Sequence, residues 1–135
     1  DVNETYFGWT PCHLAIFRKN NRLLKLLLEC PRIDPNIKSK MGETPLIFAC
    51  TGYHNHQKTI QTLLQNPRVD VNIRSRIPAL SLFCSESENL QTLELFLSKP
   101  LTTEGIEDSN GNSVLWKACN TEILERLLQD DRFNP

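Results

Sequence analysis

The sequence predicts an all-α solenoid of about four stacked helix-turn-helix repeats, in one domain that covers residues 1–135. Two blocks recur along the chain: an Asp-x-Asn triplet begins at residues 1, 34 and 70, and a Leu-Leu-x-x-Pro-Arg block begins at residues 27 and 63. Separations of 33 to 36 residues are the period of stacked repeat units. Between the blocks, leucine and isoleucine recur every three or four residues, which is typical of amphipathic helices.

The first two repeats, expected over residues 1–33 and 34–69, are the most regular. Each contains a Gly-x-Thr-Pro sequence, at residues 8–11 and 42–45. The threonine favours a helix N-cap, and the proline fits the first helical position. Proline at positions 31 and 67 predicts the end of each second helix, because a residue before proline is disfavoured in the α region.

The third and fourth repeats, expected over residues 70–105 and 106–135, are less regular. Residues 77–84 replace the Gly-x-Thr-Pro block of the third repeat, and its register is defined only to within one or two residues. The connector at residues 100–105 breaks the pattern and predicts a kink or loosened stacking. Residues 131–135 echo residues 31–35, so we expect the chain to be a segment of a longer array.

Residues 10–15 read Thr-Pro-Cys-His-Leu-Ala and residues 44–49 read Thr-Pro-Leu-Ile-Phe-Ala. Both resemble the Thr-Pro-Leu-His-x-Ala motif of the ankyrin repeat, and the resemblance covers essentially the whole chain. It implies an ankyrin-like fold in which a projecting β-turn, here called a finger, precedes each helical pair. It also implies that the imidazole of His13 ties one repeat's turn to the next by hydrogen bonding.

The resemblance implies a scaffold or adaptor module that binds another protein through its fingers and the concave face of its first helices. The positions that the repeat pattern leaves free in the first three repeats are Tyr6, Phe7, Trp9, Phe17, Arg18, Lys40, Met41, Glu43, Thr51, Arg74, Arg76 and Ile77. Aromatic residues, methionine and arginine are enriched at binding hot spots. The alternative for Tyr6, Phe7 and Trp9 is that they pack against a preceding repeat.

The composition of the chain disfavours nucleic acid and membranes as binding partners. Fifteen Lys and Arg against sixteen Asp and Glu give a net charge of −1, which disfavours nucleic acid. The most apolar run, residues 23–28, is too short for membrane insertion. Five cysteines without a Cys-x-x-Cys pair favour an intracellular, cytoplasmic setting. The partner is then another protein, and a host protein if the chain belongs to an effector.

No motif supports catalysis, a cofactor or a metal. The chain has no glycine-rich phosphate loop, nucleophile elbow or His-Glu-x-x-His sequence. Cys50, Cys84 and Cys119 recur at repeat spacing and are expected in the core, whereas His54 and His56 are expected in a solvated loop rather than a metal site. The alternative to an adaptor is a structural spacer, or the cytosolic arm of a larger membrane or effector protein with any catalysis outside this segment.

Overall fold

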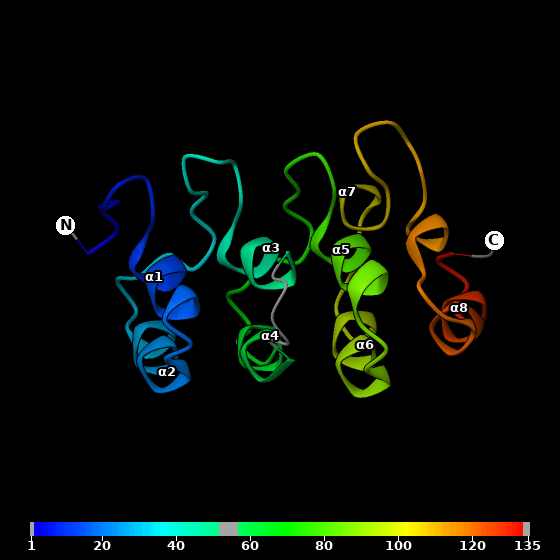
Figure 1. The fold of residues 1–135 in the computed structure, drawn as a ribbon, viewed down its shortest axis with the longest axis horizontal. Coiled ribbons are helices and arrows are strands. Elements are labelled where there is room, and N and C mark those ends of the chain that lie inside the picture. The colour runs from blue at the N-terminus through cyan, green and yellow to red at the C-terminus, as the bar shows by residue number, and fades with distance from the viewer. Residues whose placement is uncertain (1, 52–56, 134–135) are drawn as a thin grey trace. The chain divides into compact units, whose positions relative to one another are not determined.

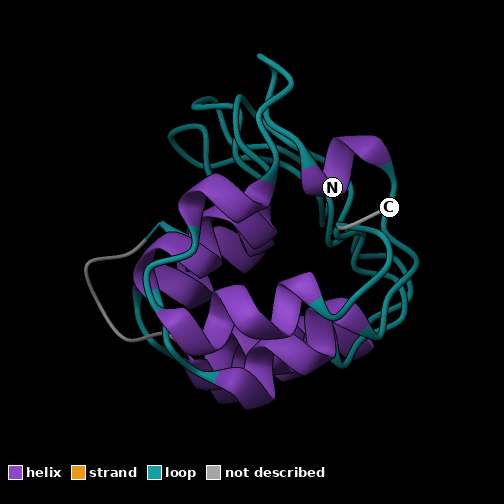
Figure 2. Cartoon of the chain, turned by 90° about the vertical axis from the view of Figure 1, so that its right-hand side faces the viewer, coloured by secondary structure: helices purple, strands orange, loops and turns teal. Residues whose placement is uncertain are grey.

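The computed structural model describes residues 2–51 and 57–133 and divides the chain into two compact units, Asp1–Asp70 and Val71–Pro135. The described residues form helices and loops with isolated β-bridges but no strand (Figure 2). The predicted all-α fold is therefore confirmed. The single domain expected over residues 1–135 stays a prediction, and His54 and His56 lie outside the described residues.

The first unit contains two helical pairs, each preceded by a finger (Figure 1). The first pair is α1 (Pro11–Phe17) and α2 (Asn21–Glu29), and the second is α3 (Pro45–Cys50) and α4 (Gln57–Leu64). Helix α1 packs against α2 and α3, while α2 packs against α4. The first helices therefore lie beside one another next to the fingers, and the second helices lie on the far side of them.

The second unit contains α5 (Ala79–Glu86), α6 (Leu90–Leu97), α7 (Thr103–Ile106), the 3-10 helix η1 (Val114–Lys117) and α8 (Thr121–Leu128). Helices α5 and α6 form its first pair, and η1 and α8 form its second. Helix α5 packs against η1 and α7, and α6 packs against α8. The rings of Phe83 and Phe96, 5.3 Å apart between centroids, join α5 to α6 in the core.

The helix starts follow the capping chemistry of each repeat. The hydroxyl oxygens of Thr10 and Thr44 accept hydrogen bonds from the backbone N–H groups of His13 and Ile47. Pro78 stands at the N-cap of α5 and makes no side-chain cap. Helix α5 nevertheless forms because its residues are strongly apolar, and burial rather than capping stabilises most helices in proteins.

Asparagine side chains join successive turns in both units. The amide of Asn36 donates to the backbone oxygen of Arg68 at 2.8 Å and accepts from the backbone N–H of Asp70 at 2.8 Å. Asn3 does the same to Arg32 and Asp34, and Asn72 does the same to Pro100 and Thr102. A carboxamide carries both a donor and an acceptor, so a single side chain satisfies two backbone groups of the next turn. We call these three residues the asparagine clamps.

Two arginines bind the carbonyl ends of second helices. The Arg68 guanidinium donates to the backbone oxygens of Leu28, Cys30 and Ile33, at the end of α2. Arg132 donates to the backbone oxygens of Leu97 and Lys99, at the end of α6. The last carbonyls of a helix have no partner within it and carry partial negative charge, so a cation there is favourable.

Two expectations need correction in the second unit. The connector at residues 100–105 is not loosened, because residues 103–106 form α7 and pack against α5. Cys119 is exposed rather than buried in the core. The reason is that η1 ends at Lys117, so Cys119 lies beyond the helix, where its thiol donates to the backbone oxygen of Ser87 at 3.3 Å.

No helix in the described ranges is long and apolar enough to cross a membrane.

Candidate partner-binding surface

The first finger displays a phenylalanine at its tip. Tyr6 and Trp9 exchange two backbone hydrogen bonds of 2.8 and 3.0 Å, and Phe7 and Gly8 between them have φ of 51° and 83°. Two successive positive φ angles define a type I′ hairpin turn, which glycine and asparagine favour and a bulky side chain disfavours. The Phe7 side chain is 79% exposed, so burial within the chain does not offset this cost.

The second finger lies directly beside the first. The backbone N–H of Lys40 donates to the oxygen of Gly8 at 2.9 Å. The Lys40 stem also covers Gly8 so closely that a Cβ there would lie 2.5 Å from the Lys40 Cδ atom. At its tip, Met41 precedes Gly42 at φ 82° and is 72% exposed. Two large apolar side chains therefore project from neighbouring finger tips.

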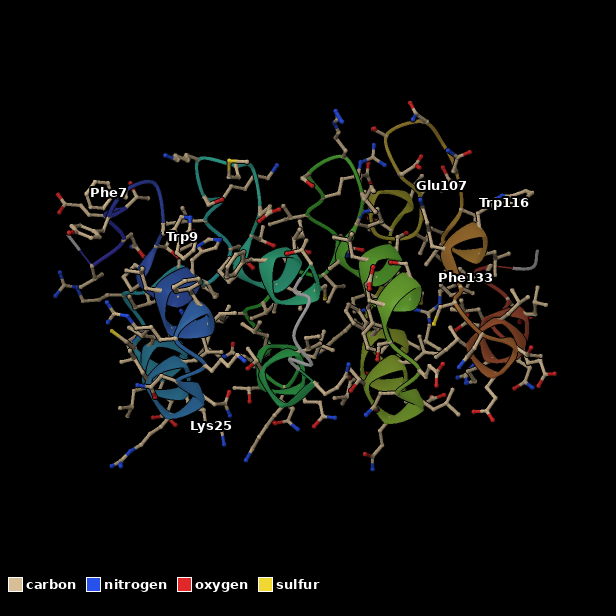
Figure 3. All side chains as sticks on the ribbon, viewed as in Figure 1. Phe7, Trp9, Lys25, Glu107, Trp116 and Phe133 are labelled. Atoms are coloured by element: carbon tan, nitrogen blue, oxygen red, sulfur yellow. The ribbon has the colours of Figure 1, made fainter. Side chains whose placement is uncertain are left out.

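An aromatic cluster continues from the fingers to the first helices. The Trp9 ring lies 5.1 Å from Phe17 and 5.1 Å from Phe48 between centroids. Phe17 is exposed, whereas Trp9 and Phe48 are half-buried. Figure 3 shows Trp9 between its finger and the helices, with Phe7 further out. We call Phe7, Trp9, Phe17, Met41 and Phe48 together the aromatic patch.

The contacts bear on whether the first-finger aromatics belong to a preceding repeat. Trp9 contacts the helices of its own pair and the next one. Tyr6 occupies the register position of Lys40, whose stem lies over the preceding finger, and its ring contacts Phe7 at 4.5 Å. Phe7 occupies the register position of Met41 at the free tip. Trp9 therefore packs within the described repeats, and the packing of Tyr6 and Phe7 against a preceding repeat stays a prediction.

His13 holds the two fingers at the base of this patch. Its Nε2 lies 2.8 Å from the backbone oxygen of Glu43, and its Nδ1 lies 2.7 Å from the hydroxyl oxygen of Thr10. Because a carbonyl oxygen only accepts, Nε2 carries the proton and Nδ1 accepts from Thr10. The ring is fully buried, and this burial lowers its pKa below the ordinary value. The expectation that His13 ties one turn to the next is confirmed.

The buried neutral His13 makes the stability of the chain depend on pH. An unfolded histidine titrates near 6.5, above the folded-state pKa of His13, so below about pH 6.5 the unfolded chain binds more protons. We expect the contribution of neutral His13 to the free energy of unfolding to be complete above pH 6.5. The free energy of unfolding should then decrease as the pH is lowered to 5. Urea unfolding of the wild type and of His13→Gln at each pH measures this, and parallel pH profiles would contradict it.

The other predicted residues divide by exposure. Arg18 and Arg76 are exposed, and Glu43, Thr51 and Ile77 are half-buried. Arg74 makes hydrogen bonds within its own unit, where its Nη1 donates to the backbone oxygens of Glu107 and Asp108 at 2.8 and 3.1 Å. No local sequence feature predicts these bonds, since an arginine in a finger is expected to be a solvent-facing charge.

Two aromatic residues were missed. Phe48 joins the patch from inside the Thr-Pro motif, whose pattern predicts a core position there rather than a surface one. Trp116 on η1 is the most exposed large hydrophobic residue described. Alignment of the repeats could have revealed it, because Trp116 occupies the motif position of His13 and Ile47, where a buried residue is expected.

The cysteines offer a direct test of the local structure. Cys12, Cys50 and Cys84 are buried, and burial raises the pKa of Cys12 to about 11 and that of Cys84 to about 12. The thiolate is the reactive form, so these thiols should react slowly with a maleimide, and the exposed Cys119 should be labelled first. Peptide mapping of a native-state time course checks the order. Labelling of Cys84 before Cys119 would contradict both the burial of Cys84 and the exposure of Cys119.

No group of three or more His, Cys, Asp or Glu side chains suited to a metal ion occurs among residues 2–51 and 57–133. The surface described above presents large apolar side chains held on two finger tips and on the first helices, with cationic side chains beside them.

Comparison with known proteins agrees with this geometry. A human protein, transient receptor potential cation channel subfamily A member 1, is 44% identical over 41 residues, which are 30% of this chain and 4% of the channel's length. The family model described as "Ankyrin repeats (3 copies)" matches residues 1–75, more than half of the chain. Ankyrin repeats are a non-catalytic fold and are generally protein–protein interaction modules. The chain belongs to the ankyrin repeat family.

Proposed function

We propose that this chain is a scaffold or adaptor module that binds another protein through the aromatic patch. The observation that carries the proposal is Phe7, a bulky side chain held in a disfavoured left-handed conformation and directed into solvent. Strained residues of this kind persist where function requires them. Met41 beside it and the Trp9–Phe17 pair below it extend the same apolar surface.

The charges beside the patch support an acidic partner segment with apolar anchors. Arg18 and Lys19, which follow Phe17, and Lys40, which precedes Met41, are exposed. Glu43 is the acidic residue nearest the tip of the second finger; it is half-buried, and burial raises its pKa. A patch with cations at its rim attracts negative charge over distances of about 10 Å, so binding should weaken as salt increases.

The test replaces both finger tips by asparagine. Asparagine tolerates positive φ, and it already stands at the equivalent tip of the fourth finger as Asn110, so Phe7→Asn with Met41→Asn should leave the melting temperature unchanged or slightly higher. Binding should fall at least tenfold, because residues of these types dominate binding energies. The measurement is capture of partners by immobilised wild type and variant, with affinity then determined for each partner by titration.

The matched control is Leu26→Gln, which removes another exposed apolar side chain, from α2 and away from the fingers. It should retain every partner. If the finger variant retains the partners and Leu26→Gln loses them, the module binds through α2 and the proposed surface is wrong. If the finger variant unfolds, the assignment of Phe7 and Met41 to a free surface is wrong as well.

A second candidate is that the segment is a structural arm of a larger membrane protein. The stretch of 44% identity with a human cation channel favours it, although that stretch is 4% of the channel. In this case Phe7 and Met41 would contact another part of the same polypeptide. Sequencing the complete transcript that contains this segment tests the candidate, because membrane-spanning segments in the same reading frame are required.

A further inference from the structure

Two cysteines of the second unit occupy the same position of successive repeats but differ in exposure. The sixth residue after the N-cap of each first helix is Ile16, Cys50, Cys84 and Cys119 in turn. The first three are buried inside their helices, whereas Cys119 is exposed. The difference arises because Ala118, with a ψ of 120°, leaves the helical region directly before Cys119. Cys119 therefore lies outside η1, beside the end of α5.

A backbone hydrogen bond joins the two cysteines. The N–H of Cys119 donates to the carbonyl oxygen of Cys84 at 2.9 Å. Cys84 lies in the last turn of α5, where carbonyl groups have no partner within the helix. By standard bond lengths, one such hydrogen bond holds two Cα atoms roughly 5 to 6.5 Å apart. A disulfide spans Cα atoms about 4.4 to 6.8 Å apart, so the backbone already holds these residues at a suitable separation.

The two thiols also lie near each other. The Cys119 thiol donates to the backbone oxygen of Ser87, the C-cap of α5, at 3.3 Å. Ser87 is three residues beyond Cys84, so the Cys119 sulfur lies against the last turn of α5. Burial, and then the negative charge of a Cys119 thiolate, raise the pKa of the Cys84 thiol to about 12. An effect of this charge on Cys84 requires the two groups to be close in space.

Burial gives the two thiols different access to solutes. Cys119 is exposed and can meet an oxidant in solution, whereas Cys84 is 0% exposed and cannot. Redox-sensitive sites combine an accessible thiol with a second cysteine that reacts with its first oxidation product. Cys119 has the place of the first thiol, and Cys84 has the place of the second.

We propose that Cys119 and Cys84 form a reversible disulfide in response to hydrogen peroxide. The Cys119 thiolate attacks the peroxide, so that an S–O bond forms, the O–O bond breaks and hydroxide leaves. The product is a neutral sulfenic acid, which no longer repels negative charge on Cys84. The Cys84 sulfur then attacks the Cys119 sulfur, the S–O bond breaks, and the hydroxyl group leaves with the Cys84 proton as water. Both sulfurs are oxidised, and the peroxide is reduced.

The disulfide changes the stability of the second unit. It links α5 to the segment that follows η1 and closes a loop that contains α6 and α7. A cross-link over such a loop stabilises the folded chain, chiefly by restricting the unfolded one. This goes beyond the proposed function, because it makes stability respond to an oxidant, whichever partner the aromatic patch binds.

The test treats the whole chain with hydrogen peroxide under native conditions and maps its peptides without reduction. Trypsin cuts after Lys117 and so separates the two cysteines unless a disulfide joins them. We expect the peptides that contain Cys84 and Cys119 to be linked, and dithiothreitol to release them. The melting temperature should rise by several degrees on oxidation and return on reduction.

Three variants assign the roles of the two thiols. Cys119→Ser, an exposed change, should keep the melting temperature of the reduced wild type but show no rise with peroxide. Cys84→Ala should accumulate a sulfenic acid at Cys119 that dimedone traps. Cys30→Ser, which changes a half-buried cysteine, is the matched control and should oxidise as the wild type does.

A treated wild type whose Cys84 and Cys119 remain unlinked overturns the proposal, whatever else is oxidised. Linkage of either residue to another cysteine, within the chain or between two chains, overturns it as well. If Cys84→Ala does not fold, the Cys119→Ser variant still decides, because a rise in its melting temperature with peroxide would contradict the assigned pair.

Discussion

Replacing Leu127 by alanine is expected to destabilise the chain by about 2 to 5 kcal/mol. Leu127 is fully buried in α8, on the face that packs against α6. The closely packed neighbouring side chains cannot shift far enough to fill the cavity that alanine would leave. Urea unfolding followed by helix circular dichroism measures the change. The midpoint should move to lower urea while the slope stays the same, since the unfolded chain exposes nearly the same surface.

The next residue provides the control. Leu128→Ala removes the same atoms from the same helix, but the Leu128 side chain is 44% exposed whereas that of Leu127 is fully buried, so we expect a loss of only about 0.5 kcal/mol. Helix propensity contributes equally to both variants. If Leu128→Ala is the more damaging change, the assignment of buried and exposed faces to α8 is wrong.

Replacing Gly105 by alanine is expected to destabilise the chain, although such a change in a helix ordinarily stabilises it by about 0.4 to 1 kcal/mol. A Cβ at this position would lie 2.1 Å from the Oδ1 atom of Asn72. Asn72 would have to move away, and its hydrogen bonds to Pro100 and Thr102 would break. Leaving these backbone groups without partners costs about 1 to 3 kcal/mol.

Thr103→Ala, an exposed change in the same helix, is the matched control and should have an effect near zero. Urea unfolding of both variants measures whether each substitution raises or lowers the free energy of unfolding. If Gly105→Ala instead stabilises the chain, the close contact between Gly105 of α7 and the Asn72 side chain is wrong. Asn72→Ala in the Gly105→Ala background adds a further check: the two losses should be much less than additive, since both remove the same contacts.

Local chemistry explains which parts of the fold were predictable. Thr10 and Thr44 mark helix starts, and the prolines that follow α2, α4 and α6 mark helix ends, through their own backbone preferences, which need no tertiary contact. Helix α7 was not predictable, because its Thr-Glu-Gly-Ile sequence has no apolar periodicity and its glycine matters only through contact with Asn72. The 3-10 rather than α-helical form of η1 was also not predictable, since its sequence has the same apolar pattern as the other first helices.

The candidate site was predicted in part for the same reason. Repeat register placed Phe7, Trp9, Phe17 and Met41 outside the buried pattern, and the structure brings Trp9 and Phe17 into contact. Phe48 was not recognised, because a single position of the motif faces both the core and the patch. The internal hydrogen bonds of Arg74 depend on where residues 107 and 108 lie, which the sequence of the finger alone does not reveal.

The hydrogen bonds described above from the asparagine clamps, and from Arg68 and Arg132 to the helix ends, reach peptide groups of the neighbouring turn or helix end. Every residue type offers the same backbone oxygen, and every residue except proline offers the same N–H. These polar contacts between neighbouring repeats therefore place no demand on the side chains of the neighbour, whereas the packing between helices such as α2 and α4 does. A substitution at an exposed finger tip such as Phe7 or Met41 therefore leaves this backbone-directed part of the repeat contact intact.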